Sequence, residues 1–107
     1  NKLSVNSNNE STKLVKLNIT TNRIKSIKEK NIKNQITKYE IKIEAKVEYV
    51  FLTNGTSNNF TSTVNGFYNV ASIYSKTLNN EKNLVNLLVD NLSENILETL
   101  NNELNDL

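Results

Sequence analysis

The feature that most constrains this fold is the stretch KYEIKIEAKVEYVF at residues 38–51, where two kinds of residue alternate without a break. From Tyr39 to Phe51 the odd-numbered positions are apolar or small, whereas the even-numbered positions up to Glu48 alternate lysine with glutamate. Successive side chains of a β-strand point to opposite faces, so this pattern predicts a long strand, from about Gln35 to Leu52, with one apolar and one charged face. The apolar face must be buried against a second layer.

A shorter alternating segment precedes this strand. Val15, Leu17 and Ile19 alternate with polar residues, which predicts a first, half-buried strand. The alternation loosens over residues 23–27, and the polar residues 28–31 then predict the turn that joins the two strands.

A third strand is predicted after the clearest turn signal in the chain. Residues 53–58 contain an Asn54-Gly55 pair, which suits a backbone with positive φ. Residues 60–68 then alternate again, with a bulge or bend expected at Asn65-Gly66. Together the three segments predict an antiparallel meander.

From about Thr77, which is a candidate helix cap, the apolar period changes from two to three and four residues, as in an amphipathic helix. The opposite side of this helix is polar, with Asn86, Asp90, Glu94, Glu98 and Asn101. The apolar stripe consists of Val85, Leu88, Val89, Leu92, Ile96, Leu100, Leu104 and Leu107. The predicted fold class is therefore α+β: a two-layer sandwich in which an antiparallel meander of at least three strands is covered on one face by the long C-terminal helix.

Composition limits the chemistry that this single domain can perform. The sequence has no Cys and no His, so it lacks disulfides, thiolate chemistry and the commonest general base and metal ligand. No apolar run approaches the ~18 residues of a membrane-spanning helix, and no signal segment is visible. We expect no enzymatic activity, no cofactor and no metal. Charge is uneven: residues 1–76 hold 12 Lys/Arg against 5 Asp/Glu, and residues 77–107 hold 1 against 6.

The order of four segments carries a resemblance to a known family. They are the strand YEIKIEAKVEYVF, an Asn-Gly turn, the strand FTSTVNGFYNV and the helix entry ASIYSKTLNNEKN. Over roughly residues 12–107 this order resembles the LptE family of lipopolysaccharide-assembly lipoproteins, and residues 74–78 are similar to that family's Tyr-Ala-Thr-Leu-like helix entry. The sequence departs from the family in lacking its lipid-carrying N-terminal Cys and its first strand-plus-helix unit. Residues 1–11 are expected to be a flexible tail or a remnant of that unit.

The resemblance implies a non-enzymatic protein of the outer membrane, on its periplasmic face. Such a protein would plug and stabilise the LptD β-barrel and contact lipopolysaccharide. It would be held at the membrane by an N-terminal lipid anchor that is not present in this chain, and it would not bind nucleic acid. Two alternatives remain open: another periplasmic lipoprotein, such as an accessory subunit of a lipid transporter, and a cytosolic module that binds anions or nucleic acid.

The candidate binding residues are cations near the expected first hairpin. A cluster of lysines focuses positive potential and can bind phosphates and carboxylates, here those of lipopolysaccharide. In a Lys-rich protein the simpler interpretation is that the same residues form a solvated surface. The candidates are Arg23, Lys25, Lys28, Lys30, Lys33 and, just before the helix, Lys76.

Two other sets are better explained by structure than by chemistry. Glu40, Glu44 and Glu48 recur every four residues, or about 13 Å along a strand, which is too far for the paired carboxylates of a glycosidase. The seven aromatic residues include three on the apolar face of residues 39–51, so core packing is a better interpretation than base stacking. They are Tyr39, Tyr49, Phe51, Phe60, Phe67, Tyr68 and Tyr74.

Overall fold

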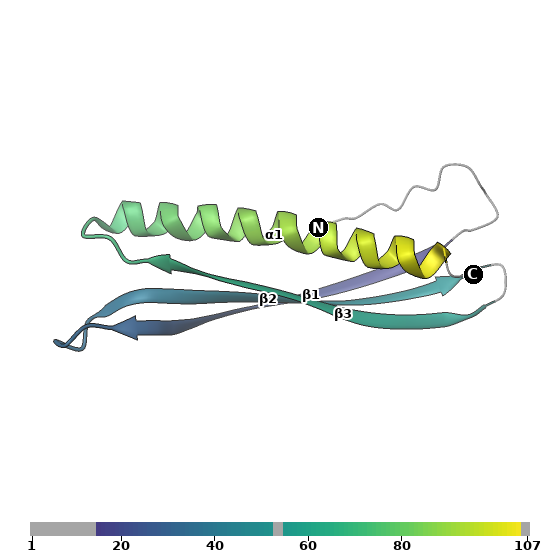
Figure 1. Cartoon of the computed structure of the whole chain (residues 1–107), viewed down its shortest axis with the longest axis horizontal. Coiled ribbons are helices and arrows are strands. Elements are labelled where there is room, and N and C mark those ends of the chain that lie inside the picture. The colour runs from purple at the N-terminus through teal and green to yellow at the C-terminus, as the bar shows by residue number, and fades with distance from the viewer. Residues whose placement is uncertain (1–14, 53–54, 106–107) are drawn as a thin grey trace.

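A computed structural model describes residues 15–52 and 55–105 as one sheet and one helix (Figure 1). The elements are β1 (Val15–Lys30), β2 (Ile36–Phe51), β3 (Ser57–Asn69) and α1 (Tyr74–Asn105). The sheet is an antiparallel meander in the order β1-β2-β3, and α1 lies across one face. The predicted two-layer α+β sandwich is confirmed. The expected tail at residues 1–11 and the stripe residue Leu107 lie outside the described residues, as does the side chain of Leu104.

The core forms between the alternating face of β2 and the apolar stripe of α1. Ile41, Ala45 and Val47 have no exposed surface, and the other odd-numbered residues of β2 from Ile43 to Phe51 are also buried. The helix contributes four buried residues, namely Leu88, Leu92, Ile96 and Leu100. Burial of each large apolar side chain contributes about 1.5–3 kcal/mol, so this interlayer contact dominates the stability of the fold.

The helix differs from its prediction at two positions. It begins at Tyr74, before the predicted cap Thr77. The Thr77 hydroxyl instead accepts a hydrogen bond from the Ala71 amide at 2.7 Å, which ties the first turn of the helix to the preceding loop. Val89, expected in the buried stripe, is 45% exposed. Leu84 packs against the core instead, because the stripe follows the helix period of 3.6 residues.

The first hairpin is longer than predicted. Residues 28–31 do not form the turn, because β1 continues to Lys30 and the connection is residues 31–35. The side-chain Oδ1 of Asn31 accepts hydrogen bonds from the backbone amides of Lys33 and Gln35, at 2.9 and 3.0 Å. Asn34 has a φ of 65°, a conformation that Asn tolerates better than most residues. These side chains make an ordered turn without the Asn-Gly signal.

The bulge predicted in β3 at Asn65-Gly66 is absent, since β2 and β3 pair there without a register shift. The shifts lie instead in the β1–β2 pair, on both sides of Glu29. Gly66 has a different role, because side chains of the helix pack closely against its backbone. A Cβ at Gly66 would lie 2.7 Å from Leu84 Cδ1, so the absence of a side chain permits this packing.

The molecule is a rod with principal extents of 60 × 20 × 18 Å. One end contains the β1–β2 turn, the end of β3 and the start of α1, and we call it the hairpin end (Figure 1). At the opposite end, β2 turns into β3 and α1 finishes (Figure 1). There the buried Tyr49 donates a hydrogen bond to Glu103, and burial together with Glu103 raises the pKa of Tyr49 to about 12. This contact fixes the last described turns of the helix to the sheet.

Candidate functional site

All six candidate cations lie in the half of the rod that finishes at the hairpin end. Lys30 is the last residue of β1, and Lys33 lies within the turn. Lys76 is in the first turn of α1, which starts at this same end (Figure 1). The fold therefore brings together two parts of the sequence that are more than forty residues apart. The sequence alone did not show at which end Lys76 would lie.

Two of the six cations are held by the helix. Arg23 and Lys25 lie on the helix-facing side of β1, beside Ile43 and Ile41 of β2. Lys25 Nζ donates to Glu81 Oε1 at 3.2 Å, and Arg23 Nη2 lies 3.8 Å from Glu81 Oε2. Glu81 belongs to α1, so these ion pairs join the edge strand β1 to the helix across the sheet. Arg23 and Lys25 are thus already paired within the protein.

Two tyrosines complete this arrangement, which we call the Glu81 cluster: Glu81, Arg23, Lys25, Tyr39 and Tyr68. The Tyr68 hydroxyl donates to Glu81 Oε1 at 2.9 Å. The rings of Tyr39 and Tyr68 stack with centroids 5.5 Å apart. Lys25 Nζ lies 4.5 Å from the centroid of Tyr39, a cation–π distance. Each charged member therefore has a partner of opposite charge within the cluster.

The electrostatics of the cluster favour charged Glu81. Burial opposes the charged form, but hydrogen bonds from Tyr68 and Lys25 and the nearby positive charges outweigh it, so the pKa of Glu81 is lowered. The Tyr68 hydroxyl and Glu81 raise the pKa of Lys25 against the effect of its burial. Burial also raises the pKa of Tyr68, and Glu81 adds to that rise. The cluster is a stable ion-pair network near neutral pH.

Glu81 was not among the candidates from the sequence, although a signal was present. It lies four residues before Val85 and seven before Leu88, which places it on the apolar stripe of the helix. A carboxylate on such a stripe faces the sheet and requires a partner. The identity of that partner depends on the register of β1, which the helix pattern does not determine.

The other four candidates are exposed. Lys28 lies in β1 beside the register shift, with its Nζ 4.8 Å from the centroid of Phe67 on the outer face of the sheet. Among the described residues, Lys30, Lys33 and Lys76 make no side-chain hydrogen bond or ion pair. Their charges face solvent and are available to an anionic partner.

A depression of about 450 Å³ lies beside the Glu81 cluster at the hairpin end. Its wall combines Lys25 and Glu81 with apolar groups from β2, the β3–α1 loop and the start of α1. The apolar residues include Ile36, Tyr39, Val70 and Leu78. The depression thus has charged and apolar walls next to the exposed lysines.

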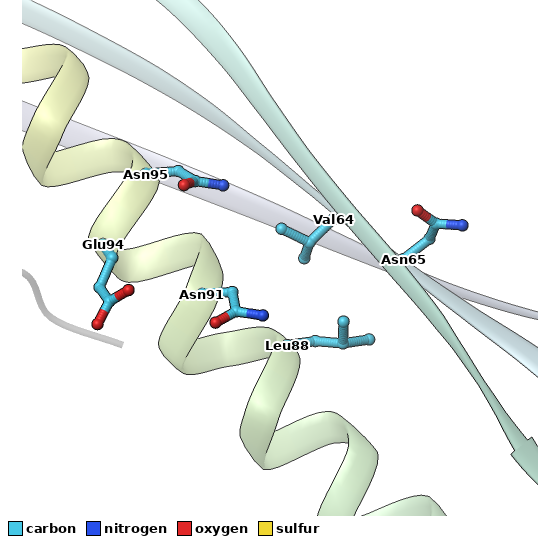
Figure 2. Close-up of a pocket in the computed structure, with 6 residues that line it drawn as sticks. All are labelled: Val64, Asn65, Leu88, Asn91, Glu94 and Asn95. Carbon is cyan, nitrogen blue, oxygen red and sulfur yellow. The ribbon is translucent and has the colours of Figure 1, made fainter.

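A second depression, of about 350 Å³, lies between α1 and β3 near the middle of the rod (Figure 2). Leu88 and Asn91 project from the helix towards β3, and Val64 points back towards the helix (Figure 2). Asn65 points to the opposite face of the strand, where its side chain donates to Glu40 at 2.9 Å. The wall has few charges that could select a ligand, so this depression is a weaker candidate.

The outer face of the sheet carries the alternating lysines and glutamates of β2. Lys42 pairs with Glu44 at 3.5 Å, and Glu48 accepts a hydrogen bond from Asn18 at 3.3 Å. These contacts are exposed and of low energy. Two aromatic residues predicted to pack in the core are not there, because Phe67 and Tyr74 are 45% and 74% exposed.

Comparisons with protein-family models, curated proteins and solved structures find no match to this chain. The resemblance to the LptE family stays a prediction. No helix in the described part of the chain has the length and apolarity needed to cross a membrane. The described residues also contain no group of three or more acidic side chains placed to hold a metal ion.

Proposed function

We propose that this protein is a non-enzymatic lipoprotein of lipopolysaccharide assembly in the outer membrane, similar to LptE. In this role it stabilises the LptD barrel and contacts lipopolysaccharide through its hairpin end. The observation that carries the proposal is the group of exposed lysines at one end of the rod, Lys30, Lys33 and Lys76. They come from two distant segments, and none has an anionic partner among the described residues.

Physical chemistry supports an anionic ligand at this end. Exposed lysines act as point-charge binders of phosphate, and several of them together raise the local concentration of anions. Arg23 and Lys25 contribute less to binding than the sequence suggests, because Glu81 already neutralises part of their charge. The candidate ligand contacts therefore narrow to Lys28, Lys30, Lys33 and Lys76.

The test is binding of purified lipopolysaccharide at fixed salt. The double variant Lys30→Glu/Lys33→Glu should weaken binding by about tenfold or more, since each lysine near an anionic surface contributes about 1 kcal/mol. The matched control is Lys16→Glu/Lys46→Glu, which makes the same change in net charge on exposed strand positions distant from the hairpin end. Circular dichroism establishes that both variants fold. Equal weakening by the two variants, or none by the first, contradicts the proposed contact.

The barrel partner is tested separately by co-purification of the tagged full-length protein from envelope extracts. Recovery of LptD is the expected result. Recovery of an inner-membrane lipid transporter in its place supports the alternative of an accessory transporter subunit and contradicts the proposed role.

A further inference from the structure

Exposed apolar side chains collect at the same end as the exposed lysines. Among the described residues, eleven large hydrophobic side chains are exposed, and several of them lie at the hairpin end. Soluble proteins seldom leave such groups together without a partner. Five are on the two loops of this end or the first two turns of α1: Ile32, Val70, Ile73, Tyr74 and Leu78.

The two loops present these side chains in a similar way, and we call residues 30–35 and 70–78 the tip. In the first loop, Ile32 is 100% exposed and lies between Lys30 and Lys33. In the second, Ile73 and Tyr74 are 54% and 74% exposed and precede Lys76. Each loop therefore combines exposed apolar surface with at least one neighbouring lysine.

The tip is held in place by hydrogen bonds. The Asn31 side chain binds two backbone amides of the first loop. In the second, Thr77 binds the Ala71 amide, and the Asn80 side chain donates to the Asn69 carbonyl at 3.0 Å. A loop whose backbone is already ordered loses less entropy when it binds a partner, which favours binding.

We propose that the tip docks on an anionic lipid bilayer, with Ile32, Ile73 and Tyr74 entering the headgroup region while the lysines contact lipid phosphates. Interfacial segments combine apolar area with positive charge in this way, and the flexible stems of lysine let the ammonium group stay in the polar layer. Tyrosine is also favoured at membrane interfaces. The tip is the narrow end of a 60 × 20 × 18 Å rod, so its exposed side chains can reach a surface without contact by the rest of the molecule. The docking goes beyond the proposed function, because it requires neither lipopolysaccharide nor a barrel.

The experiment is flotation of the full chain with vesicles free of lipopolysaccharide, made of phosphatidylcholine alone or mixed with phosphatidylglycerol. We expect binding to the mixed vesicles and little to phosphatidylcholine. Ile32→Gln/Ile73→Gln should reduce binding to the mixed vesicles by about tenfold or more, because two apolar side chains no longer leave water. The matched control Leu87→Gln/Val89→Gln changes two exposed apolar residues of α1 distant from the tip and should bind as the wild type does. Wild-type binding by the tip variant overturns the proposal.

A fluorescent reporter measures insertion directly, since the sequence contains no Trp. The emission of Ile32→Trp should shift to the blue on mixed vesicles, whereas that of Leu87→Trp should not. A shift that appears without vesicles and grows with protein concentration means that a second copy covers the tip, and this result also overturns the proposal. The two proposals can fail separately. If Lys30→Glu/Lys33→Glu loses lipopolysaccharide binding but the wild type does not bind the vesicles, the proposed function is supported and the docking is rejected.

Discussion

At the scale of single residues, Glu81 is a junction between elements that was not among the candidates named from the sequence. It receives hydrogen bonds from Lys25 and Tyr68 and lies beside Arg23, so one carboxylate links β1, β3 and α1. The helix lies mainly over β3 and β2, and the ion pairs of Glu81 also connect it to the edge strand β1. The cluster therefore stabilises the outermost part of the sheet as well as the helix.

Replacing Glu81 with Gln should lower the free energy of unfolding at neutral pH by about 1 kcal/mol, because the amide accepts ordinary hydrogen bonds in place of charge-assisted ones that are roughly twice as strong. The pKa of Glu81 is lowered in the folded state, so its stabilisation is present above its ordinary value of 4.5 and is lost as pH falls through the lowered value. Urea denaturation at several pH values should show the wild type and Glu81→Gln converging under acid conditions.

The control for this prediction is Glu98→Gln on the exposed side of the same helix. It should leave stability unchanged at neutral pH, as surface substitutions generally do. A gap between the wild type and Glu81→Gln that stays constant down to the acid range would mean that the carboxylate charge does not stabilise the fold.

At the scale of the elements, the contact between β3 and α1 depends on Gly66. Gly66→Ala places a methyl group 2.7 Å from Leu84 Cδ1 and 3.5 Å from Leu88 Cδ2. Overpacking costs about 1–3 kcal/mol, and the gain from replacing Gly in a strand offsets about 0.5–1 kcal/mol of it. We expect a net loss of about 1 kcal/mol in the free energy of unfolding, measured by urea denaturation.

A double-mutant cycle with Leu84→Ala identifies the source of that loss. Once the Leu84 side chain is shortened, Gly66→Ala should be neutral or stabilising, because the added methyl group then has space. The same loss in both backgrounds would show that the strain arises from the backbone of β3 and not from the helix.

The sequence predicted those elements whose pattern is set by burial. The predicted bounds of about Gln35 to Leu52 placed β2 to within one residue at each end, because one face of that strand is buried from Ile41 to Phe51 and half-buried before it. It misplaced the end of β1, since residues 28–30 are exposed on an edge strand and carry no apolar pattern. The bulge predicted at Gly66 was wrong because glycine has two explanations that the sequence does not distinguish. A bulge and a close contact with a helix both favour glycine.

The candidate site could be predicted only in part. The sequence identified the six cations, but the division into paired Arg23 and Lys25 and exposed Lys30, Lys33 and Lys76 depends on which residues of β1 lie opposite Glu81. That is a tertiary contact between segments more than fifty residues apart. The exposure of Ile32 and Tyr74 could not be predicted from the sequence either. An apolar residue outside a periodic segment can pack in the core or face solvent, and the pattern does not distinguish the two.

At the scale of the whole molecule, sheet and helix share a single core and should unfold together. Leu92→Ala removes a buried side chain from the interface and should lower the free energy of unfolding by about 2–5 kcal/mol. Far-ultraviolet circular dichroism follows mainly the helix, and tyrosine fluorescence follows mainly the sheet, which contains three of the four tyrosines, Tyr39, Tyr49 and Tyr68. The two signals should shift to the same extent in one transition.

Leu87→Ala is the matched control, because Leu87 is 55% exposed on the same helix and its truncation should cost about 0.5 kcal/mol or less. Separate transitions in Leu92→Ala for the two signals would show that the helix can leave the sheet without unfolding it.

The two ends of the rod differ in charge as well as in composition. Residues 23–43 and 64–82, towards the hairpin end, hold nine Lys/Arg against three Asp/Glu. The remaining described residues hold two against six. The formal net charge of +2 is the sum of these opposite charges and does not show that they are separated along the rod.

The 60 Å length of the rod sets how such a molecule meets a charged surface. Electrostatic fields in physiological salt decay over about 8 Å, so the two ends are screened from each other. An anionic surface within this distance attracts the cationic hairpin end and repels the anionic other end. These opposite forces exert a torque that turns the rod end-on as it approaches such a surface. The orientation of the rod is therefore selected before its net charge matters.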